Sequence, residues 1–78
     1  CGAPEFYTAG AKLCPVPGAH GRLAVDALER AFAGFRLNDP HQTQPGALSL
    51  SQATEAGTVY RPDEVAALAA WAHARGMR

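Results

Sequence analysis

Hydrophobic positions follow a helical period in two stretches of the chain. Residues 24–33 place Val25, Leu28 and Phe32 along one side and charged side chains along the other, and residues 62–74 repeat the pattern after a proline and two acids. Apolar residues three and four positions apart form one face of an amphipathic helix. Acidic residues early and basic residues late also suit the helix dipole. We therefore predict helices over 24–33 and 62–74.

Two shorter stretches favour extended chain. Residues 12–16 are short and apolar, and residues 47–52 alternate leucine with serine. Alternation with a period of two indicates a strand that buries one face. Pro15 limits the first strand, because proline cannot donate to a hydrogen-bond ladder. An early proline and a closing glycine predict a further short helix over 3–9.

The predicted order is helix, strand, helix, strand, helix. Strands joined by helical crossovers favour parallel pairing in an α/β fold. We therefore predict a partial three-layer unit whose two short parallel strands, at 12–16 and 47–52, are covered by the three helices. So small a sheet leaves open edges and apolar surface, which favours self-association.

Length and charge narrow the class of protein. The chain has 78 residues, of which 47% are hydrophobic and 18% charged, and its formal net charge is +0. This is enough for one small domain with a thin core. A neutral chain gives no reason to expect nucleic acid or a membrane surface as partner, and no apolar run approaches the ~20 residues that span a bilayer. Because the first residue is cysteine rather than methionine, we expect an internal piece of a longer protein.

Cysteine and histidine give little support for a metal site. Cys1 and Cys14 match no zinc-ligand spacing, and His20 and His41 lie singly in stretches rich in turn-forming residues. We expect reduced thiols in a cytoplasmic protein and no metal. A disulfide between the two cysteines stays open, because a sequence does not give the distance between Cα atoms that a bridge requires.

Polar side chains collect where the second predicted strand ends. Gln52, Thr54 and Glu55 follow the leucine–serine alternation, and Gly57 then turns the chain toward the last helix. A strand that ends in hydroxyl and amide groups before a helix is typical of the ligand-facing edge of an α/β sheet. The alternative is a strand and loop without chemistry.

Four segments resemble a known family. CGAPEFYTAGAKL, PVPG, QPGALSLSQATEAGTVYRPDEV and ALAAWAHARGMR are similar to the large domain of bacterial low-specificity L-threonine aldolases, a branch of the β-eliminating lyases. The resemblance covers the whole chain and is most specific over 44–60. It implies a pyridoxal-phosphate enzyme of the aspartate-aminotransferase fold, which cleaves threonine to glycine and acetaldehyde.

The resemblance also implies which site residues the chain carries. In the family, the lysine that binds the cofactor, the acid that pairs with its ring nitrogen and the phosphate-binding loop lie outside the matched segments. Lys12 matches a surface position. Gln52 and Thr54 match the strand end that faces the cofactor pocket, so we expect them to bind cofactor. Ala24 and Arg61 replace threonine caps, whose loss costs about 1 kcal/mol at a helix start.

These inferences lead to one expectation and two alternatives. We expect the parent to bind pyridoxal phosphate and a small amino acid and to form a homo-oligomer, and we expect this chain alone to hold no cofactor, to contain no catalytic residue and to be inactive. One alternative is a β-eliminating lyase that acts on another amino acid. The other is a small α/β module that binds a protein partner without catalysis.

Overall fold

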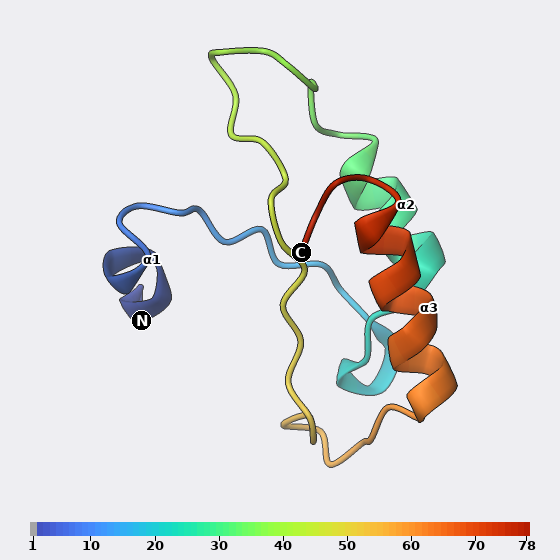
Figure 1. Cartoon of the computed structure of the whole chain (residues 1–78). Coiled ribbons are helices and arrows are strands. Elements are labelled where there is room, and N and C mark those ends of the chain that lie inside the picture. Colours follow the sequence, from blue (N-terminus) through green and yellow to red (C-terminus); the bar gives the residue numbers. More distant parts are fainter. Residues whose placement is uncertain (1) are drawn as a thin grey trace.

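The two longer helices lie side by side at one side of a largely irregular chain, and the shorter N-terminal helix lies away from them (Figure 1). A computed structural model describes residues 2–78. It contains helices α1 (Ala3–Tyr7), α2 (Val25–Phe32) and α3 (Pro62–His73) and a single 3-10 turn, η1 (Ala19–Gly21). The three predicted helices are thus confirmed in position, and each is shorter than the sequence pattern indicated.

Local chemistry defines both ends of α3. The Arg61 N–H donates to the Glu64 carboxylate at 3.2 Å, so an acid in the first turn supplies the cap that arginine cannot. At the other end Gly76 adopts φ 71°, and the Met77 N–H donates to the Ala72 carbonyl at 3.0 Å. A left-handed glycine with this bond closes a helix in the Schellman arrangement. Gly76 therefore closes α3.

The core lies between α2 and α3. Its buried residues are Leu28, Tyr60, Leu68, Trp71, Ala72 and Met77. The Phe32 and Trp71 rings meet edge to face with centroids 5.6 Å apart, a favourable geometry for aromatic pairs. The predicted apolar stripes of both helices therefore face each other.

A polar network crosses the same helix pair. The Trp71 indole N–H donates to Glu29 Oε1 at 2.6 Å, and Arg75 forms an ion pair with the same carboxylate. The Arg75 guanidinium also lies 4.3 Å from the centre of the Trp71 ring, within range of a cation–π contact. Glu29 therefore connects α2 to Trp71 in α3 and to Arg75 in the turn that follows α3.

The predicted parallel strands are wrong. Within residues 2–78 no strand forms, and both 12–16 and 47–52 are extended without a ladder between them. The pairing of the second segment is instead with Arg78, whose N–H donates to the Gly46 carbonyl at 3.1 Å and whose carbonyl accepts from the Leu48 N–H at 2.7 Å. A strand requires a continuous hydrogen-bonded partner, so the α/β unit predicted from the sequence is replaced by helices with extended connections.

The leucine–serine alternation nevertheless has a physical cause. Leu48 and Leu50 are half-buried and pack against the core, whereas Ser49 and Ser51 are exposed. Alternation of apolar and polar residues indicates that one face of an extended chain is buried. In this segment α3 covers that face, rather than a neighbouring sheet. The pattern therefore predicted correctly which side chains are buried, and it predicted the wrong element as their packing partner.

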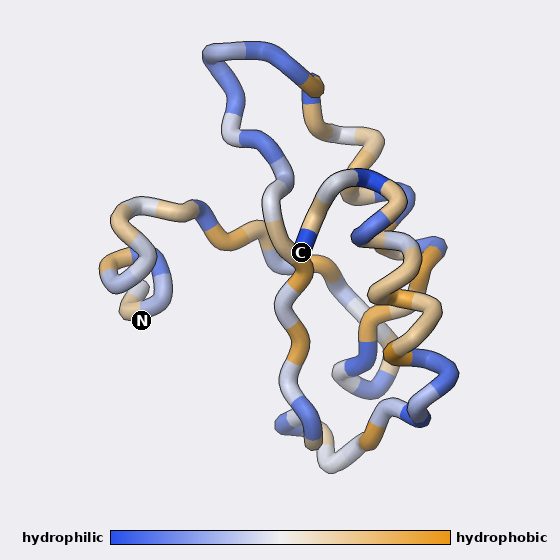
Figure 2. The backbone as a smooth tube through the Cα atoms, in the orientation of Figure 1, coloured by the Kyte–Doolittle hydropathy of each residue, from blue (hydrophilic) through white to orange (hydrophobic). Residues whose placement is uncertain are grey.

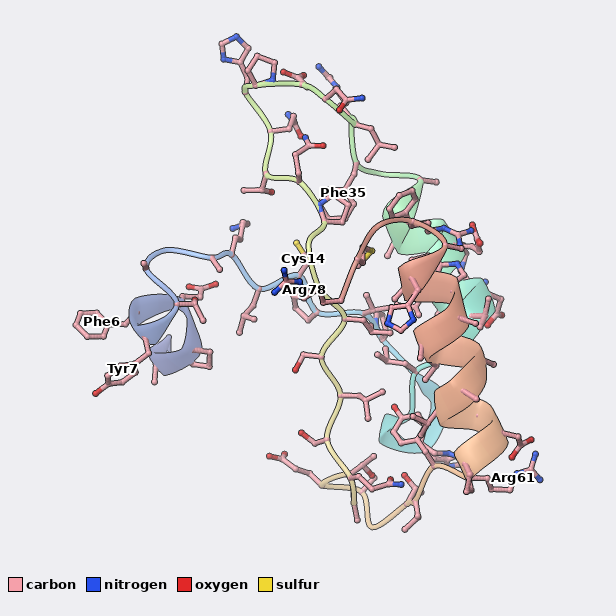
Figure 3. The ribbon with its side chains drawn as sticks, in the orientation of Figure 1. Phe6, Tyr7, Cys14, Phe35, Arg61 and Arg78 are labelled. Carbon is pink, nitrogen blue, oxygen red and sulfur yellow. The ribbon has the colours of Figure 1, made fainter. Side chains whose placement is uncertain are left out.

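Helix α1 stands apart from the helix pair (Figure 1). Phe6 and Tyr7 are 79% and 84% exposed, and Figure 3 shows both rings pointing away from the rest of the molecule. Their ring centroids lie 5.2 Å apart, so the two aromatic rings contact each other. The Glu5 carboxylate accepts from the Leu13 N–H at 3.0 Å and folds the following chain back onto α1.

The connection from α2 to the extended segment is a hydrophilic loop, coloured mainly blue in Figure 2. Gln44 organises it: its amide nitrogen donates to the Arg36 carbonyl at 3.0 Å, and its amide oxygen accepts from the Asn38 N–H at 3.0 Å. This connection is thus a loop closed by one side chain. No helix in the described part of the chain is long and apolar enough to cross a membrane.

Candidate functional site

The polar segment predicted as a strand end forms a tight hairpin loop. The Gly57 N–H donates to the Thr54 carbonyl at 3.0 Å, and the Thr54 N–H donates to the Thr58 carbonyl at 3.0 Å. Gly57 has φ 76°, which glycine adopts without steric penalty. A three-residue loop with a left-handed glycine before the second arm is a common hairpin connection. Gly57 therefore sets the geometry of the turn.

Gln52 closes this hairpin with its side chain. The amide nitrogen donates to the Tyr60 carbonyl at 2.9 Å, and the amide oxygen accepts from the Tyr60 N–H at 2.9 Å. A primary amide offers a donor and an acceptor with the same polarity as a peptide group. The Gln52 side chain therefore takes the place of a backbone partner and fixes the chain at the start of α3.

Two threonine hydroxyls face each other across the loop. Thr54 Oγ1 and Thr58 Oγ1 are 2.7 Å apart, and Thr54 Oγ1 also accepts from the Thr58 N–H at 3.2 Å. Thr58 Oγ1 donates in turn to the carbonyl of His20 at 2.6 Å. This last bond connects the hairpin to η1.

The η1 loop is held against the hairpin by further contacts. The Leu23 N–H donates to the Tyr60 hydroxyl at 2.6 Å, and Arg22 Nη1 donates to the Val59 carbonyl at 3.3 Å. Gly21 has φ 75°, and a Cβ atom there would lie 3.2 Å from Thr54 Oγ1. Glycine is therefore needed at this position, both for its conformation and for its close approach to the threonine.

An open depression of about 340 Å³ lies beside this junction, between η1, the start of α2 and α3. Its charged wall is the ion pair of Arg22 with Glu64, 3.1 Å apart, and Leu23 and Leu68 line its apolar wall. Arg22 Nε is buried and has no partner among the described residues. The depression is thus a mixed surface next to the polar hairpin.

Gln52 and Thr54 lie on the same hairpin loop, and not at the end of a strand as the sequence predicted. Gln52 is exposed and uses half of its hydrogen-bonding capacity within the hairpin, and Thr54 is half-buried and uses two thirds. One N–H and one oxygen lone pair of the Gln52 amide, and one lone pair of the Thr54 hydroxyl, remain free for a ligand. Their assignment as cofactor-binding residues stays a prediction.

The other residues considered from the sequence lie elsewhere. Lys12 and Cys14 are exposed on the extended segment, and His41 is exposed in the hydrophilic loop. Cys1 lies outside the described residues, and so does the question of its disulfide with Cys14. Residues 2–78 hold no group of three or more side chains that could bind a metal ion.

Sequence reasoning missed three residues of this junction. Thr58, Tyr60 and Arg22 all contribute bonds between η1 and the hairpin. The spacing of Thr54 and Thr58 around a glycine was a usable signal for a hairpin, because three-residue hairpin loops place glycine before the second arm. Nothing in the sequence pointed to the partner loop, which lies 37 residues before Tyr60.

The described residues fit pyridoxal phosphate only in part. The free N–H of Gln52 could donate to the hydroxyl oxygen of the pyridoxal ring, and the free lone pair of Thr54 could accept from a hydroxyl or protonated nitrogen of the ring. A phosphate requires several converging donors, and a covalent link requires a lysine in a desolvated pocket. Lys12, the lysine of the chain, lies on an exposed segment and does not line the depression beside η1.

Comparison with known proteins identifies the family. The β-eliminating lyase family matches residues 1–78. The low specificity L-threonine aldolase of Pseudomonas sp. (strain NCIMB 10558) is 39% identical over 70 residues, and that of Pseudomonas aeruginosa is 44% identical over 70 residues. Each alignment covers 90% of this chain and 20% of the relative, so the chain spans about a fifth of their length. No solved structure matches. The chain belongs to the β-eliminating lyase family.

Proposed function

We propose that this chain is part of a pyridoxal-phosphate-dependent lyase of the threonine aldolase type, which cleaves threonine to glycine and acetaldehyde. The observation that carries the proposal is the family match over residues 1–78, together with two relatives that are both low specificity L-threonine aldolases. When bound, pyridoxal phosphate accepts the electron pair released as the Cα–Cβ bond of the amino acid breaks.

In this enzyme the hairpin presents Gln52 and Thr54 to the cofactor. Two hydrogen bonds to Tyr60 orient the Gln52 amide, and contacts with Thr58 orient the Thr54 hydroxyl. Groups held in this way lose little conformational freedom on binding, which favours affinity. Their role is to bind and orient, because neither side chain is a covalent nucleophile toward the cofactor.

The chain on its own neither holds pyridoxal phosphate covalently nor cleaves threonine. Lys12 is exposed, and no acidic partner contacts it among the described residues. A covalent link to pyridoxal phosphate requires a lysine in a desolvated pocket, and this exposed segment provides none. The parent enzyme supplies the lysine of the active site and the rest of the cofactor pocket, and we expect it to be a homo-oligomer in the cytoplasm.

The test is carried out on the full polypeptide that contains this chain. Purified protein with pyridoxal phosphate should release acetaldehyde from threonine in amounts equal to the glycine formed. A β-eliminating lyase of another specificity would instead release ammonia and a keto acid from serine or cysteine. Cofactor uptake without acetaldehyde release would reject the aldolase assignment and retain the lyase family.

A further inference from the structure

The geometry determines which of the Thr54 and Thr58 hydroxyls donates a proton to the other. A threonine hydroxyl has one proton and two lone pairs. Thr58 Oγ1 lies 2.6 Å from the His20 carbonyl, which can only accept, so the Thr58 proton points to His20. The 2.7 Å contact between the two hydroxyls must then use the proton of Thr54.

Thr54 takes part in a second hydrogen bond. Its Oγ1 accepts from the Thr58 N–H at 3.2 Å, so its proton and one lone pair are both engaged within the hairpin. One lone pair is left. Gly21 approaches one side of this oxygen closely, because a Cβ atom there would lie 3.2 Å away. The remaining lone pair is thus the whole capacity that Thr54 offers to a ligand.

We infer that Thr58 makes Thr54 an acceptor-only contact, so that the ligand group it binds is a hydrogen-bond donor, a hydroxyl or a protonated nitrogen. The inference rests on the proposed function for the presence of a ligand at the hairpin. Thr58 is a positioning residue, since it acts through Thr54. The donor comes either from the amino acid or from the cofactor.

The decisive change is Thr58→Val, which keeps the shape of the side chain and removes its oxygen. The Thr54 proton is then free to rotate, so Thr54 both donates and accepts. Thr58→Ser keeps the hydroxyl and is the matched control. Tyr60→Phe is a second control: it removes the bond to the Leu23 N–H and loosens η1 without touching the two threonines.

The measurement uses the full-length protein and two kinds of ligand. Binding of serine and of its O-methyl ether to the holoprotein is followed by the change in cofactor absorbance, and binding of pyridoxal phosphate to the apoprotein is titrated separately. The ether keeps the acceptor oxygen and lacks the donor proton. Its extra methyl group weakens binding equally in all variants, so the result is the change in the serine-to-ether ratio between variants.

The expected result follows from the cost of facing one acceptor with another. An unpaired polar group at a site costs about 1–3 kcal/mol, or roughly five- to a hundredfold in affinity. The serine-to-ether ratio should fall by about that factor in Thr58→Val and stay within about threefold of wild type in Thr58→Ser and Tyr60→Phe. A small fall in cofactor affinity in Thr58→Val and not in Thr58→Ser, with the ratio unchanged, assigns the donor to the cofactor, because a freely rotating Thr54 hydroxyl loses that freedom when it accepts from the cofactor.

Two other outcomes overturn the reasoning in different ways. If the wild-type protein binds pyridoxal phosphate, and neither the ratio nor the cofactor affinity distinguishes Thr58→Val from Thr58→Ser, Thr54 is not an acceptor-only contact. If the wild-type protein binds no pyridoxal phosphate, the proposed function and the ligand of Thr54 are rejected together. Cofactor uptake by the wild type therefore separates the two failures.

Discussion

Replacing Glu29 should weaken the packing of α2 on α3 by a measurable amount. Its carboxylate accepts from the Trp71 indole N–H at 2.6 Å and pairs with Arg75. Glu29→Ala removes both interactions and leaves the Trp71 N–H, on a side chain only 7% exposed, without its acceptor. Glu29→Gln keeps an oxygen for Trp71 and removes the charge that attracts Arg75.

The two contributions differ in size. A hydrogen bond to a charged acceptor contributes about 1.5–3 kcal/mol, and the half-exposed carboxylate of Glu29 places this one at the lower end. The ion pair joins side chains that are 27% and 49% exposed, so solvent screening holds it to about 0.5–1 kcal/mol. We expect Glu29→Gln to lower the free energy of unfolding by about 0.5–1 kcal/mol and Glu29→Ala by about 2 kcal/mol.

Trp71 is the one tryptophan of the chain and lies in this network, so its fluorescence reports the contact directly. Urea titrations of the wild type and both variants give the unfolding free energies, and the slope of each titration shows whether the unfolded state has changed. Repeating them in 1 M salt should reduce the difference between wild type and Glu29→Gln, because salt screens exposed charges.

Equal stability of the two variants would refute this division, because it would mean that the indole bond contributes nothing beyond the charge. A loss below about 0.3 kcal/mol in Glu29→Ala would refute the network as a whole, since surface substitutions without a structural role commonly fall within ±0.5 kcal/mol. Arg30→Ala is a matched control, because its ion pair with Asp26 is 71% and 73% exposed and stays within α2.

Three further predictions follow from the same structure. Gly21→Ala should destabilise the protein more than Gly76→Ala. Both glycines have a positive φ, which costs another residue about 1–2 kcal/mol, but of the two only Gly21 would place its new Cβ atom within 4 Å of neighbouring atoms. Thermal melts of the two variants measure the difference in stability. The chain incubated with stoichiometric pyridoxal phosphate, reduced and mapped by peptide mass should show no stoichiometric label on Lys12, and full labelling would contradict the inactivity proposed for it. Sedimentation at micromolar concentration should show species heavier than one chain, because large apolar side chains such as Phe6 and Tyr7 are exposed; a compact monomer with a cooperative melt would exclude this.

The helices could be predicted from the sequence because their information is local. Spacing of Leu68 and Ala72, acids in the first turn and Gly76 at the end all act within a few residues. The strands could not, because alternation at Leu48 and Leu50 specifies a buried face and not the element that covers it. Pairing is a relation between distant segments, which a single sequence does not display.

The candidate site divides in the same way. Gln52 and Thr54 were identified from their place at the end of an apolar run, and the structure puts them on one hairpin. Their partners were missed, because a side chain such as Gln52 that imitates a peptide group leaves no periodic signal. The position of η1 depends on bonds to Tyr60 and Thr58, which no local pattern encodes.

The bonds between the two halves of the chain have a consequence for folding. Leu23 bonds to Tyr60 across 37 residues, Thr58 to His20 across 38, and Trp71 to Glu29 across 42. The entropic cost of closing a loop rises only with the logarithm of its length. Whichever of these contacts forms first therefore incurs most of that cost, and the other two then form with little further loss of chain entropy. We therefore expect α2 and α3 to dock in a single step and to become stable only in that step, because helices of 8 and 12 residues are marginal in isolation. In that step Trp71 fluorescence and hydrogen-exchange protection of the Leu23 N–H should appear at the same rate.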